Sequence, residues 1–522
     1  MEAASLPWWE KRGTLAALIL LSAVPLLWPD IAPLIDLPGH MARYRIELDL
    51  AHSPALQRFY EFRWGLIGNL GIDLLVVPLA PLLGLELAVK LIVLSVPPLT
   101  VAGFLWVARE VHGRVPPTAL FAVPVAYNYP FIFGFANFAL AMALAFLAFG
   151  LWLRLGRLGR LRLRAALFVP IALLLWLAHA FGWGTLGVLA FSAELVRAFD
   201  RERSRPRAAL HAVLQCLPLA VPMALMLAWR SGAVAGETAD WFNLRAKAGW
   251  LAMALRDRWA ALDIAAVIVL VLLLFEGWRH PRLEFSRMLG MSALFLALVF
   301  LCLPRIVFGS AYADMRLAPY LLAVGVLAIR PRDGMPQGVA RKLAAAGAAF
   351  FLIRTIASTA SFALYDRDFD RELAALDHLP HGARVVAFTG VSCGRQWATS
   401  RFEHLPGLAV VRREAFSNDQ WVLPGAQLLT VDYPAGGRFV ADPSQMVTAR
   451  PCPGTALLSL DEALRQVPRS AFDYIWLIAP PRHDPAALHG LVPVWRSGTS
   501  VLYRIGDPFG GRRDWEKSPL SG

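Results

Sequence analysis

Long apolar blocks separated by short polar segments fill the first two thirds of the chain. A membrane-spanning helix needs about 20 mostly apolar residues, a length that several blocks reach and others miss. We therefore predict a polytopic α-helical membrane protein with about eleven transmembrane helices. The first block lacks a clear small-residue cleavage site, which favours a retained anchor. The blocks cover residues 14–34, 87–108, 116–131, 135–153, 165–180, 183–198, 209–229, 260–278, 288–304, 317–329 and 343–364.

The basic residues between these blocks fall in alternate loops. The tight turns near 132–134 and 181–184 contain no Lys or Arg, and the longer loops 35–86, 230–259 and 305–316 mix both signs. Basic loops stay on the cytoplasmic side, so this bias predicts a cytoplasmic N-terminus, a periplasmic (extracytoplasmic) C-terminal third and residence in the cell inner membrane. The loops assigned to the inside carry Arg109, Arg114, Arg154, Arg157, Arg160, Arg162, Arg164, Arg197, Arg201, Arg203, Arg205, Arg207, Arg279, Arg282, Arg287, Arg330, Arg332, Arg341 and Lys342.

Residues 66–84 are also apolar but do not fit this alternation. Counting them as a span would put every later Arg-rich loop on the wrong side of the membrane. Pro78 and Pro81 interrupt the segment, so we interpret it as a juxtamembrane or re-entrant element of the outer loop 35–86. A twelfth span remains the alternative.

Composition agrees with a membrane protein. Hydrophobic residues make up 57% of the 522 residues and charged residues 17%, whereas soluble domains average about 45–50% and about 25%. This excludes a soluble enzyme and a disordered chain. The net charge of +13 lies mostly beside apolar blocks and lacks the interleaved aromatics of a nucleic-acid surface, so no nucleic-acid partner is expected.

The last part of the chain changes character. After a transmembrane bundle at residues 1–365, charged residues, Gly and short strand-like runs return over 366–522. Strands at 384–388, 472–478, 492–495 and 500–505, with helices at 367–378 and 460–466, predict a small extracytoplasmic α/β domain. If this domain is extracytoplasmic, Cys393 and Cys452 could form a disulfide.

Some blocks are too short at their outer ends. Residues 317–329 would make a helix of about 20 Å, against a hydrocarbon core of about 30 Å. Because Arg330 anchors the inner end, Tyr312, Asp314 and Arg316 would lie at or below the outer interface. Ionisable residues at such depth usually line a polar cavity.

Two other hairpins give the same result. The legs of 165–198 are short enough to place His179 near the outer end, and 116–153 places Asn128, Tyr129 and Asn137 at a similar depth. Together these features predict a vestibule open to the outside. Ordinary hydrogen bonding between helices is the alternative.

Candidate chemistry lies just after the first block. Asp36 precedes a Leu-Pro pair that starts a helix, His40 follows one turn later, and Arg43 lies three residues beyond. A carboxylate beside an imidazole at the outer surface could serve as a general base. Alternatively, Asp36 only caps the helix while His40 and Arg43 contact lipid headgroups.

This arrangement resembles the GT-C superfamily of integral-membrane glycosyltransferases. The resemblance covers the architecture of residues 1–365, and its one local motif is Asp36-Leu-Pro-Gly-His40. It implies a sugar donor on a polyprenyl phosphate, and an acidic residue in the first outer loop that activates the acceptor. That residue would be Asp36, with Asp30 as the alternative.

The resemblance also implies a basic residue at the donor phosphate. Arg316 is the first choice and Arg43 the second, with Tyr312, Asp314 and His179 as neighbouring substrate contacts. Some members use a metal held by further acids. The nearest acid pair here, Glu47 and Asp49, points to different helix faces, so neither a metal nor another cofactor is expected.

The predicted function is therefore transfer of a sugar from a polyprenyl-phosphate donor to a glycan, lipid or protein acceptor on the outer face of the inner membrane. A lipid or solute transporter or flippase is a rival, although we find no repeat symmetry and polar groups only toward the outer side. A non-catalytic scaffold whose outer domain binds a partner is the third hypothesis.

Overall fold

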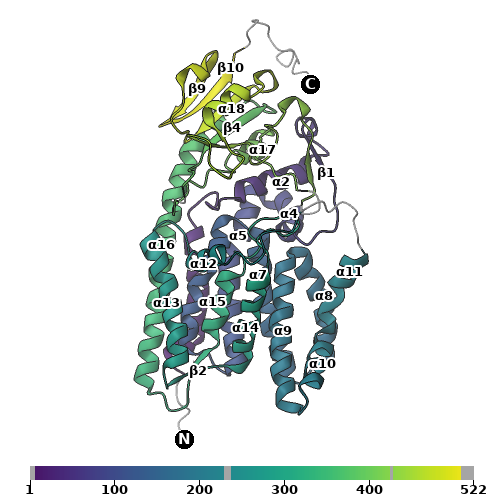
Figure 1. Ribbon diagram of the computed structural model, residues 1–522, viewed down its shortest axis with the longest axis vertical. Coiled ribbons are helices and arrows are strands. Elements are labelled where there is room, and N and C mark those ends of the chain that lie inside the picture. Colours follow the sequence, from purple (N-terminus) through teal and green to yellow (C-terminus); the bar gives the residue numbers. More distant parts are fainter. Residues whose placement is uncertain (1–5, 229–236, 395, 424–426, 507–522) are drawn as a thin grey trace.

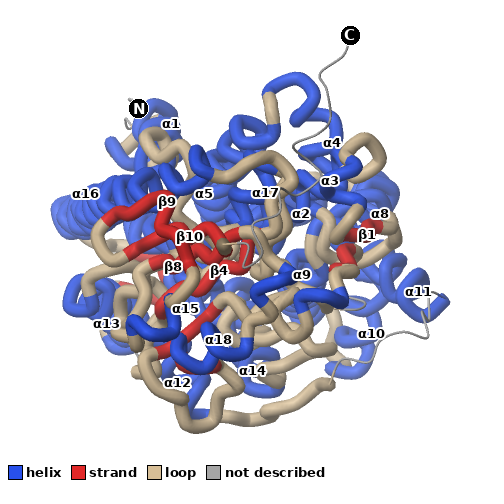
Figure 2. The backbone as a smooth tube through the Cα atoms, turned by 90° about the horizontal axis from the view of Figure 1, so that it is seen from above, coloured by secondary structure: helices blue, strands red, loops and turns tan. Residues whose placement is uncertain are grey.

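The computed structural model describes residues 6–228, 237–394, 396–423 and 427–506. An elongated helical bundle carries a smaller sheet domain at one end (Figure 1). Seen from the sheet end, the strands lie over the bundle, with α16 and α13 at one side and α10 and α11 at the other (Figure 2). The polytopic helical architecture predicted from the sequence is confirmed.

Most of the helices lie within predicted blocks, but the first block, 14–34, forms only α1 and the 3₁₀ turn η2. Those of the bundle are α1 (Arg12–Leu21), α4 (Gly71–Leu83), α5 (Leu85–His112), α6 (Tyr129–Phe133), α7 (Ala136–Arg157), α8 (Leu161–Ala178), α9 (Ala180–Arg201), α10 (Arg205–Cys216), α11 (Val221–Ala228), α12 (Leu244–Ala252), α13 (Ala260–Arg279), α14 (Arg287–Cys302), α15 (Ala318–Leu327) and α16 (Gln337–Leu373), with short 3₁₀ turns η1 (Trp8–Glu10), η2 (Val24–Leu26) and η4 (Leu217–Ala220).

Six helical stretches of the described chain are long and apolar enough to cross a membrane. Shorter apolar helices, among them α4, α14 and α15, accompany them. The six are α5, α7, α8, residues Arg205–Met226, α13 and residues Gln337–His378.

The block at 116–131 differs from its prediction. It forms an eleven-residue 3₁₀ helix, η3 (Pro117–Tyr127), every residue of which is buried. At about 2 Å per residue η3 is only about 22 Å long, and it packs against α5, α15 and α16. Pro124 lies inside it and removes a backbone donor. The apolarity of this block therefore serves packing within the protein rather than contact with lipid.

The segment at 66–84 contains a single helix, α4. Its 13 residues correspond to about 20 Å, which is short of the about 30 Å of a hydrocarbon core. It packs against α5 and α7, and Asp73 in its first turn is buried. The helix is consistent with an element of the outer loop.

The sheet domain contains one mixed six-stranded sheet in the order β7-β6-β4-β8-β10-β9. The central β4 runs parallel to β6 and β8, whereas β10 is antiparallel to β8 and β9. The strands and helices predicted from the sequence are all present, within a few residues. Their bounds are β4 (Val385–Gly390), β6 (Met446–Thr448), β7 (Leu458–Ser459), β8 (Tyr474–Ile478), β9 (Leu491–Ser497), β10 (Ser500–Ile505), α17 (Gly407–Arg413), α18 (Leu460–Gln466), η5 (Ala374–His378), η6 (Pro434–Gly436), η7 (Arg469–Ala471) and η8 (Pro485–Leu488).

A disulfide joins Cys393 and Cys452, whose Cα atoms are 5.4 Å apart. It links the segment after β4 to the segment after β6. The disulfide holds these two connections next to each other, beyond the ends of the neighbouring parallel strands β4 and β6.

Several contacts attach the sheet domain to the bundle. Helix α2 (Leu37–Asp49) packs against α17, and β1 (Tyr60–Phe62) of the outer loop pairs with β5 (Leu429–Val431). Helix α16 continues past residue 365 into the sheet domain, where Ser500 donates a hydrogen bond of 2.8 Å to Glu372. Three further elements of three or four residues complete the fold: α3 (Pro54–Gln57), and β2 (Leu283–Phe285) paired with β3 (Ile329–Pro331).

Candidate active site

Asp36 lies between the bundle and the sheet domain, at the N-cap position of α2. Its carboxylate makes no capping hydrogen bond, so the interpretation of Asp36 as a side-chain cap is wrong. Pro38 near the helix start already lacks a donor that would need a cap. The residue is only 8% exposed, and its carboxylate is therefore both buried and not used for capping.

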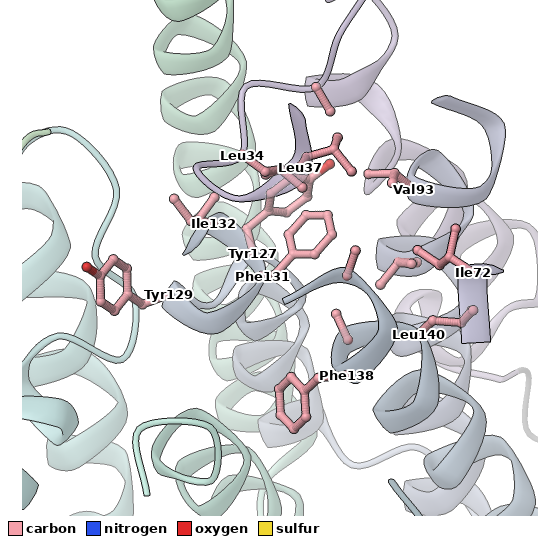
Figure 3. Packing of buried hydrophobic residues seen from close by; sticks show 14 of the residues in the cluster. Leu34, Leu37, Ile72, Val93, Tyr127, Tyr129, Phe131, Ile132, Phe138 and Leu140 are labelled. Carbon is pink, nitrogen blue, oxygen red and sulfur yellow. The ribbon is translucent and has the colours of Figure 1, made fainter. Parts of the chain in front are cut away.

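The backbone on both sides of Asp36 is fixed by the bundle. The Asp36 N–H donates a hydrogen bond of 2.9 Å to the carbonyl of Phe133. The adjacent Leu34 and Leu37 belong to the buried hydrophobic cluster and lie above Tyr127 (Figure 3). Burial of apolar side chains on each side holds the carboxylate in place without using the carboxylate itself.

The turn after α6 connects Asp36 to the loop before α15. Phe133, which accepts the Asp36 hydrogen bond, contacts the ring of Tyr312 at 5.5 Å between centroids. Two residues on, the ring of Phe135 lies 4.1 Å from the guanidinium carbon of Arg316. One short segment thus brings three residues that the sequence singled out, Asp36, Tyr312 and Arg316, to the same region.

The sheet domain contributes a histidine to this region. His404 Nε2 lies 3.9 Å from an Asp36 carboxylate oxygen and 3.7 Å from one of Asp442. On its other side, His404 Nδ1 is 3.0 Å from the backbone oxygen of Asp419. The ring packs against Trp421 at 4.1 Å. His404 therefore stands among three acidic residues.

Burial and neighbouring charges shift the pKa values of Asp36 and His404. Burial raises the pKa of Asp36 to about 7; the charge of His404 opposes that rise and the charge of Glu403 adds to it. Burial alone would lower the pKa of His404, but its acidic neighbours, with Asp419 first, outweigh burial and raise the pKa to about 9. At neutral pH the histidine is cationic, and Asp36 is near its midpoint.

His40 lies one helical turn from Asp36 but faces a different neighbour. Its ring contacts Trp421 at 4.9 Å and Tyr44 at 6.4 Å. Its Nδ1 is buried and has no hydrogen-bond partner among the described residues. The ring of His40 thus packs against aromatic rings of the protein, which does not support the headgroup interpretation of this residue.

Arg43 is engaged inside the protein. Its guanidinium pairs with Asp73 at 2.8 Å, and it donates a hydrogen bond of 3.0 Å to Gln427. Both Arg43 and Asp73 are 2% exposed. The interpretation of Arg43 as a headgroup contact is therefore wrong, and its charge is balanced where it lies.

Asp314 is likewise paired, whereas its neighbour Arg316 is not. Lys247 Nζ lies 3.3 Å from an Asp314 carboxylate oxygen and donates to the carbonyls of Phe300 and Leu303 at 2.7 Å each. Arg316 donates only to a backbone carbonyl, and its Nε has no partner among the residues that the structure describes. Of this pair, Arg316 retains donors for a ligand.

His179 ends α8 and caps α9. Its Nδ1 accepts a hydrogen bond of 3.1 Å from the N–H of Phe181, whose ring lies 5.7 Å from the guanidinium of Arg316. The ring of Phe138 also faces His179 at 5.5 Å. His179 thus contacts Phe181, whose ring in turn lies near Arg316, and it is not beside Asp36.

Several residues of the region carry no signal in the sequence. His404 and Asp442 lie in loops and Lys247 lies in the short helix α12, all without a motif, and only packing over long sequence separations brings them here. Arg256 is another: it donates 2.9 Å to the hydroxyl of Tyr129 and 2.7 Å to the carbonyl of Trp397. The Arg256 contacts bind the bundle to the segment after β4.

Metal binding finds no geometric support here. Within the described ranges no three His, Cys, Asp or Glu side chains are grouped so as to hold a metal ion. The four-residue cluster around His404 instead places a cation, the imidazolium, among the carboxylates.

Comparison with known proteins gives a structural match only. The crystal structure of ArnT from Cupriavidus metallidurans bound to undecaprenyl phosphate aligns with a TM-score of 0.50 at 12% identity, over 96% of this chain and 98% of that one. The chain has an ArnT-like fold. ArnT is a GT-C polyprenyl-phosphate-sugar glycosyltransferase, so the GT-C resemblance predicted from the sequence is confirmed at the level of the fold.

The apo structure of ArnT from the same organism aligns over the same shares of the two chains, with a TM-score of 0.49 and 13% identity. No protein-family model matches the sequence, and no curated protein matches it. The relation to ArnT therefore rests on the arrangement of elements along nearly the whole of both chains.

Proposed function

We propose that this protein is a glycosyltransferase that moves a sugar from a polyprenyl-phosphate donor to an acceptor at the outer face of the inner membrane. The observation that carries the proposal is the buried carboxylate of Asp36, which makes no capping hydrogen bond, in the same region as the unpartnered Nε of Arg316. The ArnT-like fold supports the same conclusion, because that ArnT was crystallised with undecaprenyl phosphate.

The two residues have complementary roles in the reaction. Arg316 binds the donor phosphate through its free guanidinium donors. Asp36 accepts the proton of an acceptor hydroxyl or amine as that atom attacks the anomeric carbon. The new bond joins the acceptor atom to this carbon, and the bond from the carbon to the phosphate oxygen breaks. The electron pair leaves with polyprenyl phosphate, a stable anion that needs no acid.

The proposed topology puts this reaction outside the cytoplasm. In this topology the N-terminus lies inside and residues 366–522 lie in the periplasm. The Arg-rich loops support this orientation. The disulfide between Cys393 and Cys452 supports it independently, because such bonds persist in oxidising compartments.

Substitution of Asp36 tests the proposal directly. Purified D36N protein, assayed with polyprenyl-phosphate sugars, should lose transfer by at least about a hundredfold, in line with loss of a general base. The matched control is D30N, because Asp30 is the other acid of the segment and its side chain is 86% exposed. It should retain transfer.

Two results would contradict the assignment. Undiminished turnover by D36N would remove Asp36 from the mechanism, and loss in D30N alone would move the role to Asp30. Movement of a labelled lipid across proteoliposomes without any sugar transfer would instead support the transporter hypothesis.

A further inference from the structure

His404 belongs to the sheet domain but contacts the proposed base of the bundle. It lies between β4 and α17, and its Nε2 faces Asp36 at 3.9 Å and Asp442 at 3.7 Å. The residue is 4% exposed. The helix that carries Asp36 packs directly against α17, so this contact is part of the interface between the two parts.

The ring is fixed in this position by its other neighbours. Nδ1 lies 3.0 Å from the backbone oxygen of Asp419 and 3.7 Å from a carboxylate oxygen of the same residue. Trp421 packs on one face, and a methyl group in place of the Gly39 hydrogen would lie 3.1 Å from Nδ1. Such close packing leaves the ring little freedom to turn away from Asp36.

Charge is the main property that His404 brings. Three acidic residues surround it, and despite burial they raise its pKa to about 9, so it carries a positive charge at neutral pH. The other charged groups that act on Asp36 are Glu403 and Asp442, which disfavour its ionisation, and Arg316, which favours it. Burial first, followed by the charges of Arg43 and His404, lowers the pKa of His40 well below the usual value, so His40 is neutral.

We infer, on the basis of the proposed function, that His404 is a positioning residue of the reaction: its positive charge, opposed by Asp442, sets the fraction of Asp36 that is ionised and able to accept a proton. The sheet domain thereby takes part in the chemistry of the bundle. Without His404, the buried carboxylate would face two acids and would hold its proton at higher pH.

The inference is testable because His404 and Asp442 carry opposite charges, so removing each charge should move the pH profile in opposite directions. In H404Q a positive charge is lost, so the acidic limb of the kcat/KM profile should move to higher pH, by roughly one unit. That corresponds to roughly a tenfold loss of kcat/KM on the limb and to recovery at alkaline pH. In D442N a negative charge is lost, so the limb should move to lower pH. Asp442 accepts from Gln445 at 2.8 Å, a hydrogen bond that the Asn oxygen can keep.

A purely structural His404 would behave differently. Its replacement in H404Q would then lower kcat or raise KM equally at all pH values, with no displacement of the acidic limb. That result would overturn the inference. H404K, which keeps the charge, should restore the limb toward its original position. If the His404 variants do not fold, D442N alone decides, because an unmoved or alkaline-shifted limb means that these charges do not control Asp36.

A second readout separates this inference from the proposed function. Infrared pH-difference spectra report the carboxyl titration of Asp36 in wild type, H404Q and D442N without any substrate, with D36N as the blank. Opposite displacements without any sugar transfer would support the role of His404 in ionisation and reject the glycosyltransferase proposal. Transfer activity with an unchanged carboxyl titration would reject the role of His404 alone.

Discussion

A methyl group in place of the Gly134 hydrogen would lie 2.6 Å from the backbone nitrogen of Asp36. Gly134 also has a φ of +102°, where L-residues are strained. The bundle and the start of α2 therefore approach each other at a point that tolerates no side chain. The position of Asp36, the proposed base, therefore depends on residue 134 having no side chain.

We expect G134A to displace Asp36 and to lower transfer by roughly a hundredfold, because a shift of about 1 Å in a reacting group has that effect. The matched control is G113A. Gly113 has a φ of +74° but no atom within 4 Å of the added methyl group, so it carries the backbone strain without the clash. Equal losses in both variants would contradict the argument from close approach. Initial rates and thermal unfolding measure the two effects.

The pH dependence of the wild-type enzyme follows from Asp36. A general base acts when it is ionised, and burial raises the pKa of Asp36 to about 7. We therefore expect kcat/KM to rise with pH through about 7 and to level off above it. A profile that is already flat between about pH 5 and 8, the interval around that midpoint, would show that a different group accepts the proton.

Arg316 should act on donor binding. R316Q is expected to raise the KM for the polyprenyl-phosphate sugar by about tenfold or more, because a charge-assisted contact contributes about 1.5–3 kcal/mol. R316K should recover only part of the affinity, since Lys lacks the planar fork of donors. The control is R330Q, because Arg330 pairs with Glu284 in an exposed position. An unchanged donor KM in R316Q would exclude the phosphate role.

The Arg43–Asp73 pair should matter for stability. D73N leaves a buried guanidinium without its counter-charge, which costs about 3–5 kcal/mol in comparable cases. E284Q, which removes the partner of a half-exposed pair, should cost at most about 1 kcal/mol. Denaturation of the two variants in detergent compares the losses. If D73N is as stable as E284Q, the buried pair does not hold α2 to α4.

The sequence predicted most of the helices because a span that faces lipid must be apolar over nearly its whole length. The same argument failed for η3, since a segment buried in protein is as apolar as one that faces lipid. Its prolines were the available sign that no regular span was present. The strands β4, β8, β9 and β10 of the sheet domain were predicted because their alternation and turns are local properties, whereas the short strands β6 and β7 were not predicted.

The residues of the candidate site likewise divide into those indicated by the local sequence and those whose position depends on long-range packing. The short block before Arg330 drew attention to Arg316, and the loop after the first span drew attention to Asp36. The pairing of Asp314 with Lys247 was not predictable, because Lys247 lies in the short helix α12, whose position depends on the packing of the bundle. His404 was missed for the same reason: its contact with Asp36 exists only once the two parts of the chain have docked.

Helix α16 has a consequence for how the protein can change in evolution. Its 37 residues correspond to about 55 Å, well beyond the about 30 Å of a hydrocarbon core, and it enters the sheet domain without a flexible linker. Each residue inserted into it would turn the domain by about 100° and raise it by about 1.5 Å. The length of α16 therefore fixes the rotation and height of the sheet domain relative to the bundle. Insertions should be tolerated in the surface loops but not in this helix.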